Sequence, residues 1–325
     1  MKAMVCKAFG PVDSLSFEDM PEPKCGPGNV RVAVKVAGCN FPDILQVEGK
    51  YQFKPPFPFS PGMESAGTVL ELGEGVSGFK VGQRVITRGG SGTYAEQTVC
   101  GARDVLAMPD NMSYEHGAAF PVTYGTTYHA LVQRGELKPG EVLMVHGASG
   151  GVGLTAVELG KLMGATVIAT GGSDEKLQIA KQYGADHLIN YSREKIRDRV
   201  KDITGGKGAD VIYDPVGGDA MDESIRSINW NGRILVIGFA SGRIAEVPTN
   251  YMLLKGASLV GVFWGQFTQK EPELNAQNFR ELLKLYAEGK LKPHVSMKFP
   301  LAETKQALHA LADRKATGKV VVTVG

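Results

Sequence analysis

Residues 142–162 read VLMVHGASGGVGLTAVELGKL. The apolar run 142–145 predicts a buried strand, and the apolar spacing after Gly153 predicts a helix. The turn between them has Ala148, Gly150 and Gly153 at the three fixed positions of a GxGxxG pattern. Gly150 lets backbone N–H groups approach a pyrophosphate at the positive end of the helix, and Gly153 lets the helix pack closely on the strand. We therefore predict a dinucleotide site formed by Ser149, Gly150, Gly151, Val152 and Gly153; the alternative is a tight turn that binds nothing.

The chain before and after this turn follows two different hydrophobic periods. From about residue 122, helical stretches alternate with apolar runs at 166–169, 187–191, 210–213 and 233–238. Such alternation predicts an α/β domain with a doubly wound parallel sheet of the Rossmann type. Residues 1–121 instead show short period-two strands between Gly and Pro residues, which predict a β-rich, partly closed barrel. We assign residues 122–264 to the Rossmann domain, and residues 1–121 with 265–325 to the β-rich domain.

Composition sets the class of protein. The chain has 325 residues, 43% of them apolar and 22% charged, which suits two globular domains. Lys plus Arg number 36 and Asp plus Glu 34, so a net charge of +2 gives no reason to expect nucleic acid or a membrane surface as a partner. Neither a secretory signal nor a long apolar run occurs, which predicts a cytoplasmic protein. The four cysteines form no CxxC pair, which favours reduced, buried thiols.

The end of the second predicted Rossmann strand distinguishes the two pyridine dinucleotides. An acidic residue at its tip would bind the ribose hydroxyls of NAD, but none occurs there. Ser173, Lys176 and Tyr191 instead offer a hydroxyl, a cation and a phenol for a 2′-phosphate, so NADPH is favoured. Asp174 and Glu175 are the counter-evidence, because a longer turn would bring either acid to the ribose. Their alternative role is that of acids in a first helical turn capped by Ser173.

Four segments carry a family resemblance. They are GCNFPD at 38–43, GME at 62–64, the glycine turn, and TGKVVV at 317–322. Together they resemble the medium-chain dehydrogenase/reductase superfamily along nearly the whole chain, and within it the zinc-free NADPH:quinone oxidoreductases, the zeta-crystallin-like branch. The resemblance implies a GroES-like fold for the β-rich domain. It also implies a homodimer or other homo-oligomer, for which the predicted edge strand 258–263 is available.

The resemblance also bears on metal binding. Where zinc dehydrogenases of the superfamily carry Cys-His and Gly-His-Glu, this chain has Asn40, Phe41 and Met63. An amide, a phenyl ring and a thioether do not form a zinc site, so we predict no metal. Without a Lewis acid, hydride transfer suits an acceptor that spreads the added electrons over a conjugated system. The sequence therefore predicts NADPH-dependent reduction of quinones or other α,β-unsaturated carbonyl compounds.

Three catalytic residues follow from the resemblance. It places Tyr51 opposite the nicotinamide, where a phenol with a pKa near 10 is protonated and can donate. The alternative is an aromatic residue packed under the proline-rich loop 55–58. Asn40 and Thr126 are expected to orient substrate and nicotinamide; their alternatives are a turn residue and a helix-start cap. Leu45 stands where bacterial members can carry a second tyrosine, which implies a larger or more apolar acceptor site.

Further residues are expected around the cofactor. The resemblance implies that Gly238, Phe239, Val262 and Phe263 border the nicotinamide, although Val262 and Phe263 also read as a buried strand. Arg314 or Lys315 is expected to reach the 2′-phosphate, although basic residues at a helix end are also favoured by the helix dipole. His146 is interpreted as a hydrogen-bonded core residue, and Glu64 and Asp43 as structural acids.

Two other functions remain open. One is an enoyl-thioester (enoyl-CoA or acyl-carrier-protein) reductase of the same superfamily, whose carrier would be bound by Lys50, Lys54 and Arg88. The other is an NADPH-binding protein with little catalysis, as in the crystallin branch. The near-neutral charge argues against RNA binding.

Overall fold

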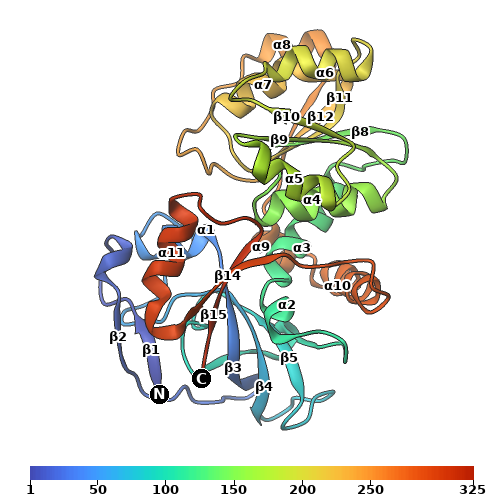
Figure 1. Cartoon of the computed structure of the whole chain (residues 1–325). Coiled ribbons are helices and arrows are strands. Elements are labelled where there is room, and N and C mark those ends of the chain that lie inside the picture. The colour runs from blue at the N-terminus through green and yellow to red at the C-terminus, as the bar shows by residue number, and fades with distance from the viewer. The chain divides into compact units, whose positions relative to one another are not determined.

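The computed structural model describes residues 1–325, which form two units (Figure 1). Met1–Val122 and Leu282–Gly325 form one, called here the GroES-like unit, and Thr123–Glu281 form the other, the Rossmann unit. The sequence-based division placed the second boundary at 264/265, so residues 265–281 lie in the unit other than the expected one. The reason is side-chain packing, because the rings of Trp264 and Phe279 meet edge to face with centroids 6.2 Å apart. Gln133 and Asn278 also exchange amide hydrogen bonds of 3.0 and 3.2 Å.

The Rossmann unit contains a six-stranded parallel sheet, which confirms the predicted fold class. Its strand order is β10-β9-β8-β11-β12-β13. The strands are β8 (Val142–Val145), β9 (Thr166–Gly171), β10 (His187–Asn190), β11 (Ala209–Asp214), β12 (Ile228–Val236) and β13 (Ser258–Gly261). The helices are α3 (Pro121–His129, which begins in the GroES-like unit), α4 (Gly151–Leu162), α5 (Asp174–Gln182), α6 (Ile196–Thr204), α7 (Asp219–Ser227), α8 (Thr249–Lys255), α9 (Trp264–Lys270) and α10 (Pro272–Ala287, which ends in the GroES-like unit). The strand order reverses between β8 and β11, and such a switch point is where ligands of open α/β sheets bind.

The GroES-like unit is built on a seven-stranded mixed sheet of order β14-β15-β3-β4-β5-β7, with β6 paired to β3. All its pairings are antiparallel except β14 with β15. The strands are β3 (Asn29–Cys39), β4 (Glu64–Leu72), β5 (Arg84–Arg88), β6 (Gln97–Gly101), β7 (Val105–Ala107), β14 (Val295–Pro300) and β15 (Lys319–Thr323), beside the hairpin β1 (Lys2–Val5) and β2 (Ser16–Asp19). The helices are α1 (Phe41–Val47), α2 (Tyr114–Ala118) and α11 (Thr304–Ala312).

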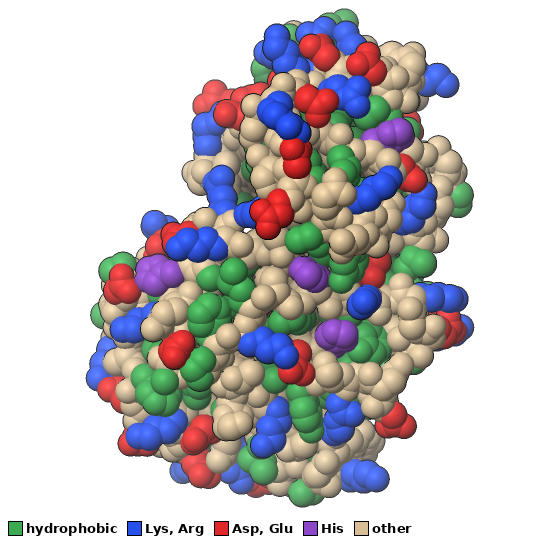
Figure 2. Space-filling model, viewed as in Figure 1, with side chains coloured by type: hydrophobic (Ala, Val, Ile, Leu, Met, Phe, Trp, Pro, Cys, Tyr) green, Lys and Arg blue, Asp and Glu red, His purple; other side chains and the backbone are tan.

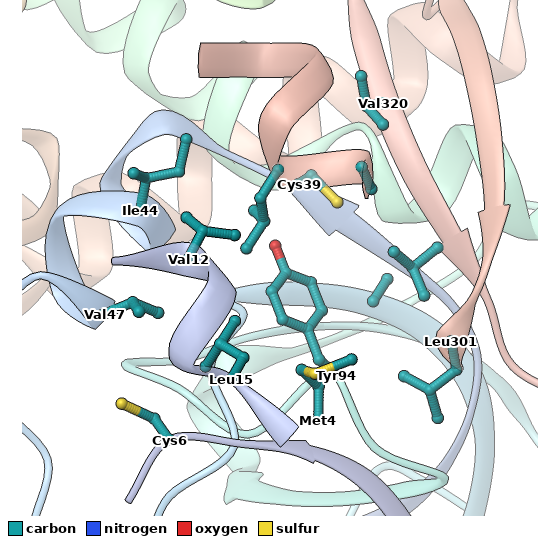
Figure 3. Packing of buried hydrophobic residues seen from close by; sticks show 14 of the residues in the cluster. Met4, Cys6, Val12, Leu15, Cys39, Ile44, Val47, Tyr94, Leu301 and Val320 are labelled. Carbon is teal, nitrogen blue, oxygen red and sulfur yellow. The ribbon is translucent and has the colours of Figure 1, made fainter. Parts of the chain in front are cut away.

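Tyr94 lies at the centre of the main core of this unit (Figure 3). Figure 3 shows Leu15 and Val12 on one side of its ring and Leu301 and Val320 on the other. Residues from both ends of the sequence therefore share one core. This packing explains why the C-terminal segment belongs to the GroES-like unit.

Two sequence expectations concern the whole chain. None of the helices is long and apolar enough to cross a bilayer. All four cysteines are free, with Cys6 and Cys39 buried and Cys25 and Cys100 half-buried, so the expected burial holds for two of them.

Lys and Arg side chains alternate with Asp and Glu over the face seen in Figure 2.

Candidate active site

The glycine turn between β8 and α4 has the geometry of a phosphate cradle. Gly150 is the N-cap residue of α4, and the first helical hydrogen bond runs from the N–H of Leu154 to the carbonyl of Gly150 at 2.8 Å. The N–H groups of the preceding three residues therefore have no partner within the helix and face the N-terminal end. A Cβ at Gly153 would lie 2.2 Å from the carbonyl oxygen of Gly147, so only glycine allows this close packing. The turn thus fits a pyrophosphate at the switch point of the sheet.

His146 anchors the turn and is not placed for proton transfer. Its Nδ1 lies 2.9 Å from Oγ1 of Thr170 and its Nε2 lies 2.8 Å from Oγ of Ser224. Burial lowers the pKa of this imidazole and so favours its neutral form. The interpretation of His146 as a hydrogen-bonded core residue is confirmed.

The structure brings Ser173, Lys176 and Tyr191 to the carboxyl ends of two adjacent strands, β9 and β10. Ser173 caps α5, and its Oγ accepts the backbone N–H of Lys176 at 3.3 Å. A Cβ at Gly172 would lie 3.1 Å from the hydroxyl oxygen of Tyr191, so glycine gives this ring its place beside the turn. The Ser173 hydroxyl, the ammonium-bearing side chain of Lys176 and the Tyr191 phenol therefore lie at the same end of the parallel sheet, where β9 and β10 finish.

Asp174, one of the two acids whose presence favours NAD, already has hydrogen-bond partners within the protein. Its Oδ1 accepts a hydrogen bond from the Arg193 guanidinium at 2.5 Å and another from Nδ2 of Asn190 at 2.8 Å. A carboxylate held by two donors is less available to the ribose hydroxyls. Sequence reasoning missed Arg193, which follows Tyr191 by two residues.

The residues expected around the nicotinamide differ in their exposure. Phe239 follows β12 and is 43% exposed, and Phe263 precedes α9 and is 50% exposed. Val262 is buried, as its alternative interpretation states, and its N–H donates to the carbonyl of Val236 at 3.0 Å just past the end of β13. For Phe263, which is half exposed and lies outside β13, the alternative of a buried strand is wrong. Gly238 lies in the loop after β12. The contacts of these four residues with a cofactor stay a prediction.

Thr126 lies inside α3, so its alternative role as a helix-start cap is wrong. Its side chain is half-buried and has no recorded hydrogen bond. The adjacent Thr127 is the structural residue, because its hydroxyl lies 2.8 Å from that of Thr155 and 3.0 Å from that of Tyr213. The orienting role expected of Thr126 stays a prediction.

Asn40 lies in a buried polar network in the GroES-like unit. Its Nδ2 donates to Oε1 of Glu64 at 2.8 Å, and its Oδ1 accepts from Nζ of Lys319 at 2.7 Å. The Lys319 ammonium also donates to Oε1 of Glu64 and to the carbonyl of Cys39, each at 2.7 Å. Oε2 of Glu64 accepts the backbone N–H of Val122 at 2.7 Å. The prediction that Glu64 is a structural acid is confirmed; Lys319 was missed, and its one signal is a charge at the start of an apolar strand.

Asp43 is the second buried acid beside Asn40. Its Oδ2 accepts the Tyr94 hydroxyl at 2.5 Å and the Asn40 backbone N–H at 2.8 Å, whereas its Oδ1 is buried without a partner. Burial raises the pKa of Asp43 to about 7. Figure 3 shows the Tyr94 ring with its hydroxyl directed toward Cys39. Asp43 is therefore a hydrogen-bonded structural acid, as predicted, without a directly paired cation.

Tyr51 follows α1 and is half-buried. Its backbone N–H donates to the carbonyl of Leu45 at 3.1 Å, and its hydroxyl has no recorded hydrogen bond. Burial raises its pKa, and the nearby charge of Asp43 raises it further. The phenol is therefore protonated at neutral pH and can donate. The alternative interpretation has Tyr51 packed under the proline-rich loop 55–58. In that loop the aromatic contact is made by Phe57, which packs edge to face on Phe9 with ring centroids 4.6 Å apart.

The residues at the expected metal-ligand positions do not form a metal site. Asn40 is committed to Lys319 and Glu64, Met63 is buried, and Phe41 is a partly exposed ring at the start of α1. The structure contains no group of three or more His, Cys, Asp or Glu side chains that could hold a metal ion.

Arg314 and Lys315 follow α11 in the GroES-like unit. Nζ of Lys315 lies 2.9 Å from a carboxylate oxygen of Asp313, and Arg314 has a positive φ of 56°. Their expected contact with a 2′-phosphate stays a prediction.

Comparison with known proteins gives the family. The family model of the alcohol dehydrogenase GroES-like domain matches residues 26–110, and that of zinc-binding dehydrogenases matches residues 151–288. Quinone oxidoreductase-like protein 2 of Mus musculus is 40% identical, over 95% of this chain and 89% of the relative. The chain belongs to the zinc-free quinone oxidoreductase family of medium-chain dehydrogenases/reductases.

Two further members of the zinc-free quinone oxidoreductase family match the chain over nearly its full length. A quinone oxidoreductase of Pseudomonas aeruginosa is 35% identical over 97% of both chains. The crystal structure of Escherichia coli quinone oxidoreductase complexed with NADPH is 30% identical, with a TM-score of 0.92 over 99% of this chain and 100% of the other. The predicted family, its oxidoreductase class, and its GroES-like and Rossmann folds are confirmed.

Proposed function

We propose that this protein catalyses the NADPH-dependent reduction of quinones or other conjugated carbonyl compounds without a metal ion. The observation that carries the proposal is the set of hydrogen bonds made by the Asn40 amide. At a position where zinc relatives have a metal-binding thiolate, this chain has a neutral amide that is held by a buried lysine and a buried glutamate. A conjugated acceptor suits such a site, because hydrogen-bond donors suffice to stabilise its spread charge.

The proposed roles follow the chemistry of each side chain. A bound nicotinamide supplies the electrons. Tyr51, whose phenol is protonated, donates a proton or a hydrogen bond to the acceptor. Asn40 and Thr126 orient acceptor and nicotinamide. The glycine turn 149–153 holds the pyrophosphate, as its unpaired helix N-terminus favours.

Turnover of a small acceptor panel tests the function. Purified protein with NADPH is expected to reduce a naphthoquinone or an enone. Tyr51→Phe is expected to lower kcat about 10²-fold, the usual loss for one general acid, with the NADPH affinity unchanged. Tyr251→Phe, which changes an exposed phenol on α8, is the control and should turn over like the wild type.

The two other functions are outcomes of the same panel. Preference for an enoyl thioester would make the protein an enoyl-thioester reductase, and tight NADPH binding without turnover would leave a binding role. The three cations considered for a thioester carrier are partly committed elsewhere. Lys50 pairs with Glu48 at 2.9 Å, Arg88 pairs with Asp104 at 2.8 Å, and Nζ of Lys54 lies 5.7 Å from the Phe9 ring centroid.

We propose a preference for NADPH over NADH because Ser173, Lys176 and Tyr191 lie together at the carboxyl ends of β9 and β10. Lys176→Glu is expected to weaken NADPH binding by about 2 kcal/mol and to spare NADH, because a charge-assisted contact is replaced by repulsion. Fluorescence titration with both dinucleotides measures the difference. Lys207→Glu, an exposed residue before β11 at the opposite end of the sheet, is the control. Equal weakening of both dinucleotides would refute the assignment.

We propose that the expected homodimer or other homo-oligomer forms through the edge strand of the Rossmann unit. β13 is an edge strand, and Leu259 on it and Leu253 and Leu254 on the preceding helix are exposed. An exposed sheet edge with apolar side chains favours pairing with a second copy. The cytoplasmic location stays a prediction.

A further inference from the structure

The buried pair of Lys319 and Glu64 fixes which way the Asn40 amide faces. An ammonium can only donate hydrogen bonds, and a carboxylate can only accept them. Lys319 must therefore meet Oδ1 of Asn40, and Glu64 must meet Nδ2, as the distances of 2.7 and 2.8 Å show. The reversed amide would place NH₂ against the ammonium and oxygen against the carboxylate, with two repulsive contacts in a buried site.

The pair is built into the fold rather than being a surface contact. The side chains of Lys319 and Glu64 are 6% and 0% exposed. Gly38 makes room for the carboxylate, because a Cβ there would lie 2.6 Å from Oε1 of Glu64. The ammonium has three oxygen partners at 2.7 Å, which satisfies all three of its protons. A buried ion pair with its hydrogen bonds satisfied confers specificity of arrangement more readily than stability.

The arrangement leaves one hydrogen-bonding capacity of the Asn40 amide available. Its Oδ1 is taken by the ammonium, and one Nδ2 proton by the carboxylate. The other Nδ2 proton has only the carbonyl of Gly38, at 3.5 Å, which is at the limit of a hydrogen bond. The strongest remaining capacity of this amide is therefore to donate.

We propose that Lys319 and Glu64 are positioning residues that hold Asn40 as a hydrogen-bond donor, and that the group Asn40 meets is a carbonyl oxygen of the acceptor. The proposal rests on the proposed function and specifies its recognition step. Neither Lys319 nor Glu64 touches the acceptor; each acts through Asn40.

The test removes both charges together. Lys319→Met alone strands a buried carboxylate and is expected to lower Tm by roughly 10 °C. The double variant Lys319→Met/Glu64→Gln leaves no unpaired charge and is expected to keep Tm within about 3 °C of the wild type. Its amide at position 40 is no longer fixed, so the Kd for 1,4-naphthoquinone, measured by calorimetry, should rise about tenfold or more, the loss expected for one hydrogen bond of about 1.4 kcal/mol. NADPH affinity should change less than about twofold.

Two comparisons separate positioning from general damage. In an Asn40→Ala background, the Lys319→Met/Glu64→Gln changes should have no further effect on naphthoquinone Kd, because residues that act through one amide are not additive. Lys298→Met, which breaks the exposed pair of Lys298 with Glu115, is the control and should leave Kd unchanged. An unchanged Kd in a double variant with wild-type Tm would overturn the proposal.

A second variant keeps the proposal testable if the double variant does not fold. Lys319→Arg retains a group that can only donate, so naphthoquinone Kd should stay within about threefold of the wild type. A larger loss at unchanged Tm would contradict the proposal. Because Kd needs no turnover, a wild type that binds naphthoquinone without reducing it would refute the proposed function and leave this inference standing.

Discussion

Alanine at position 153 will abolish measurable NADPH binding and lower the free energy of unfolding by about 3 kcal/mol, the upper range for an overpacked site. The added Cβ would lie 2.2 Å from the Gly147 carbonyl oxygen and 2.8 Å from its carbon. Both are backbone atoms, so the turn itself must move by roughly 1 Å, and a displacement of that size is enough to misplace binding groups. Denaturant titration and fluorescence titration with NADPH measure the two effects.

Two other glycines make the comparison specific. A Cβ at Gly150 meets only the Gly147 carbonyl oxygen at 3.3 Å, so Gly150→Ala should weaken NADPH binding while leaving stability within about 1 kcal/mol. Gly261, on β13, has no atom within 4 Å of an added Cβ, and Gly261→Ala should change neither property. A Gly153→Ala protein that binds NADPH like the wild type would show that the turn is not the cofactor site.

Asp43→Asn will remove a pH dependence from the stability of the GroES-like unit. The pKa of Asp43 is raised from 3.8 to about 7 by burial, so the folded chain holds a proton there that the unfolded chain releases. Its contribution to stability is therefore full below pH 4 and is lost as the pH rises toward 7. Raising the pKa from 3.8 to about 7 corresponds to about 4 kcal/mol. The difference in unfolding free energy between variant and wild type should move by that amount in favour of the variant between pH 4 and pH 8.

The surroundings of Asp43 set the sign of this effect. Burial is the largest influence on Asp43 and raises its pKa, and the charge of Glu64 acts in the same direction. The Tyr94 hydroxyl, the Asn40 backbone N–H and the charge of Lys319 favour the ionised acid but do not outweigh burial. Asp110→Asn, at an exposed site of the same unit, is the control and should show no comparable slope. A difference that moves in favour of the wild type as pH rises would mean that Asp43 is held ionised, which contradicts the assignment.

Local patterns in the sequence predicted the Rossmann unit well, because its strands, glycine turn and caps depend on residues close together in the chain. The interpretation of Ser173 as a cap could be made from its own helix, and the structure agrees. The boundary at 264/265 could not, since helical periodicity shows that α10 is a helix but not which unit its apolar face joins. Val262 shows the same ambiguity between a buried strand and a site residue.

Lys319 escaped prediction for a different reason. Its partner Glu64 lies 255 residues earlier in the chain, and no local period connects them. Asn40 was selected through the resemblance, but the residues that orient its amide become visible only when β3, β4 and β15 are aligned in one sheet. Buried polar networks between distant segments are therefore the part of this structure that local sequence patterns do not predict.

The place of β15 in the sheet constrains the order in which the protein can fold on the ribosome. The Rossmann unit is one continuous segment and can close as soon as residue 281 has emerged. The other unit cannot, because β3 must wait for β15, whose Val321 pairs with Gly38. Until β15 has emerged, residues Val36–Cys39 of the nascent β3 therefore have an unpaired edge, and this segment is where we expect a chaperone to be needed.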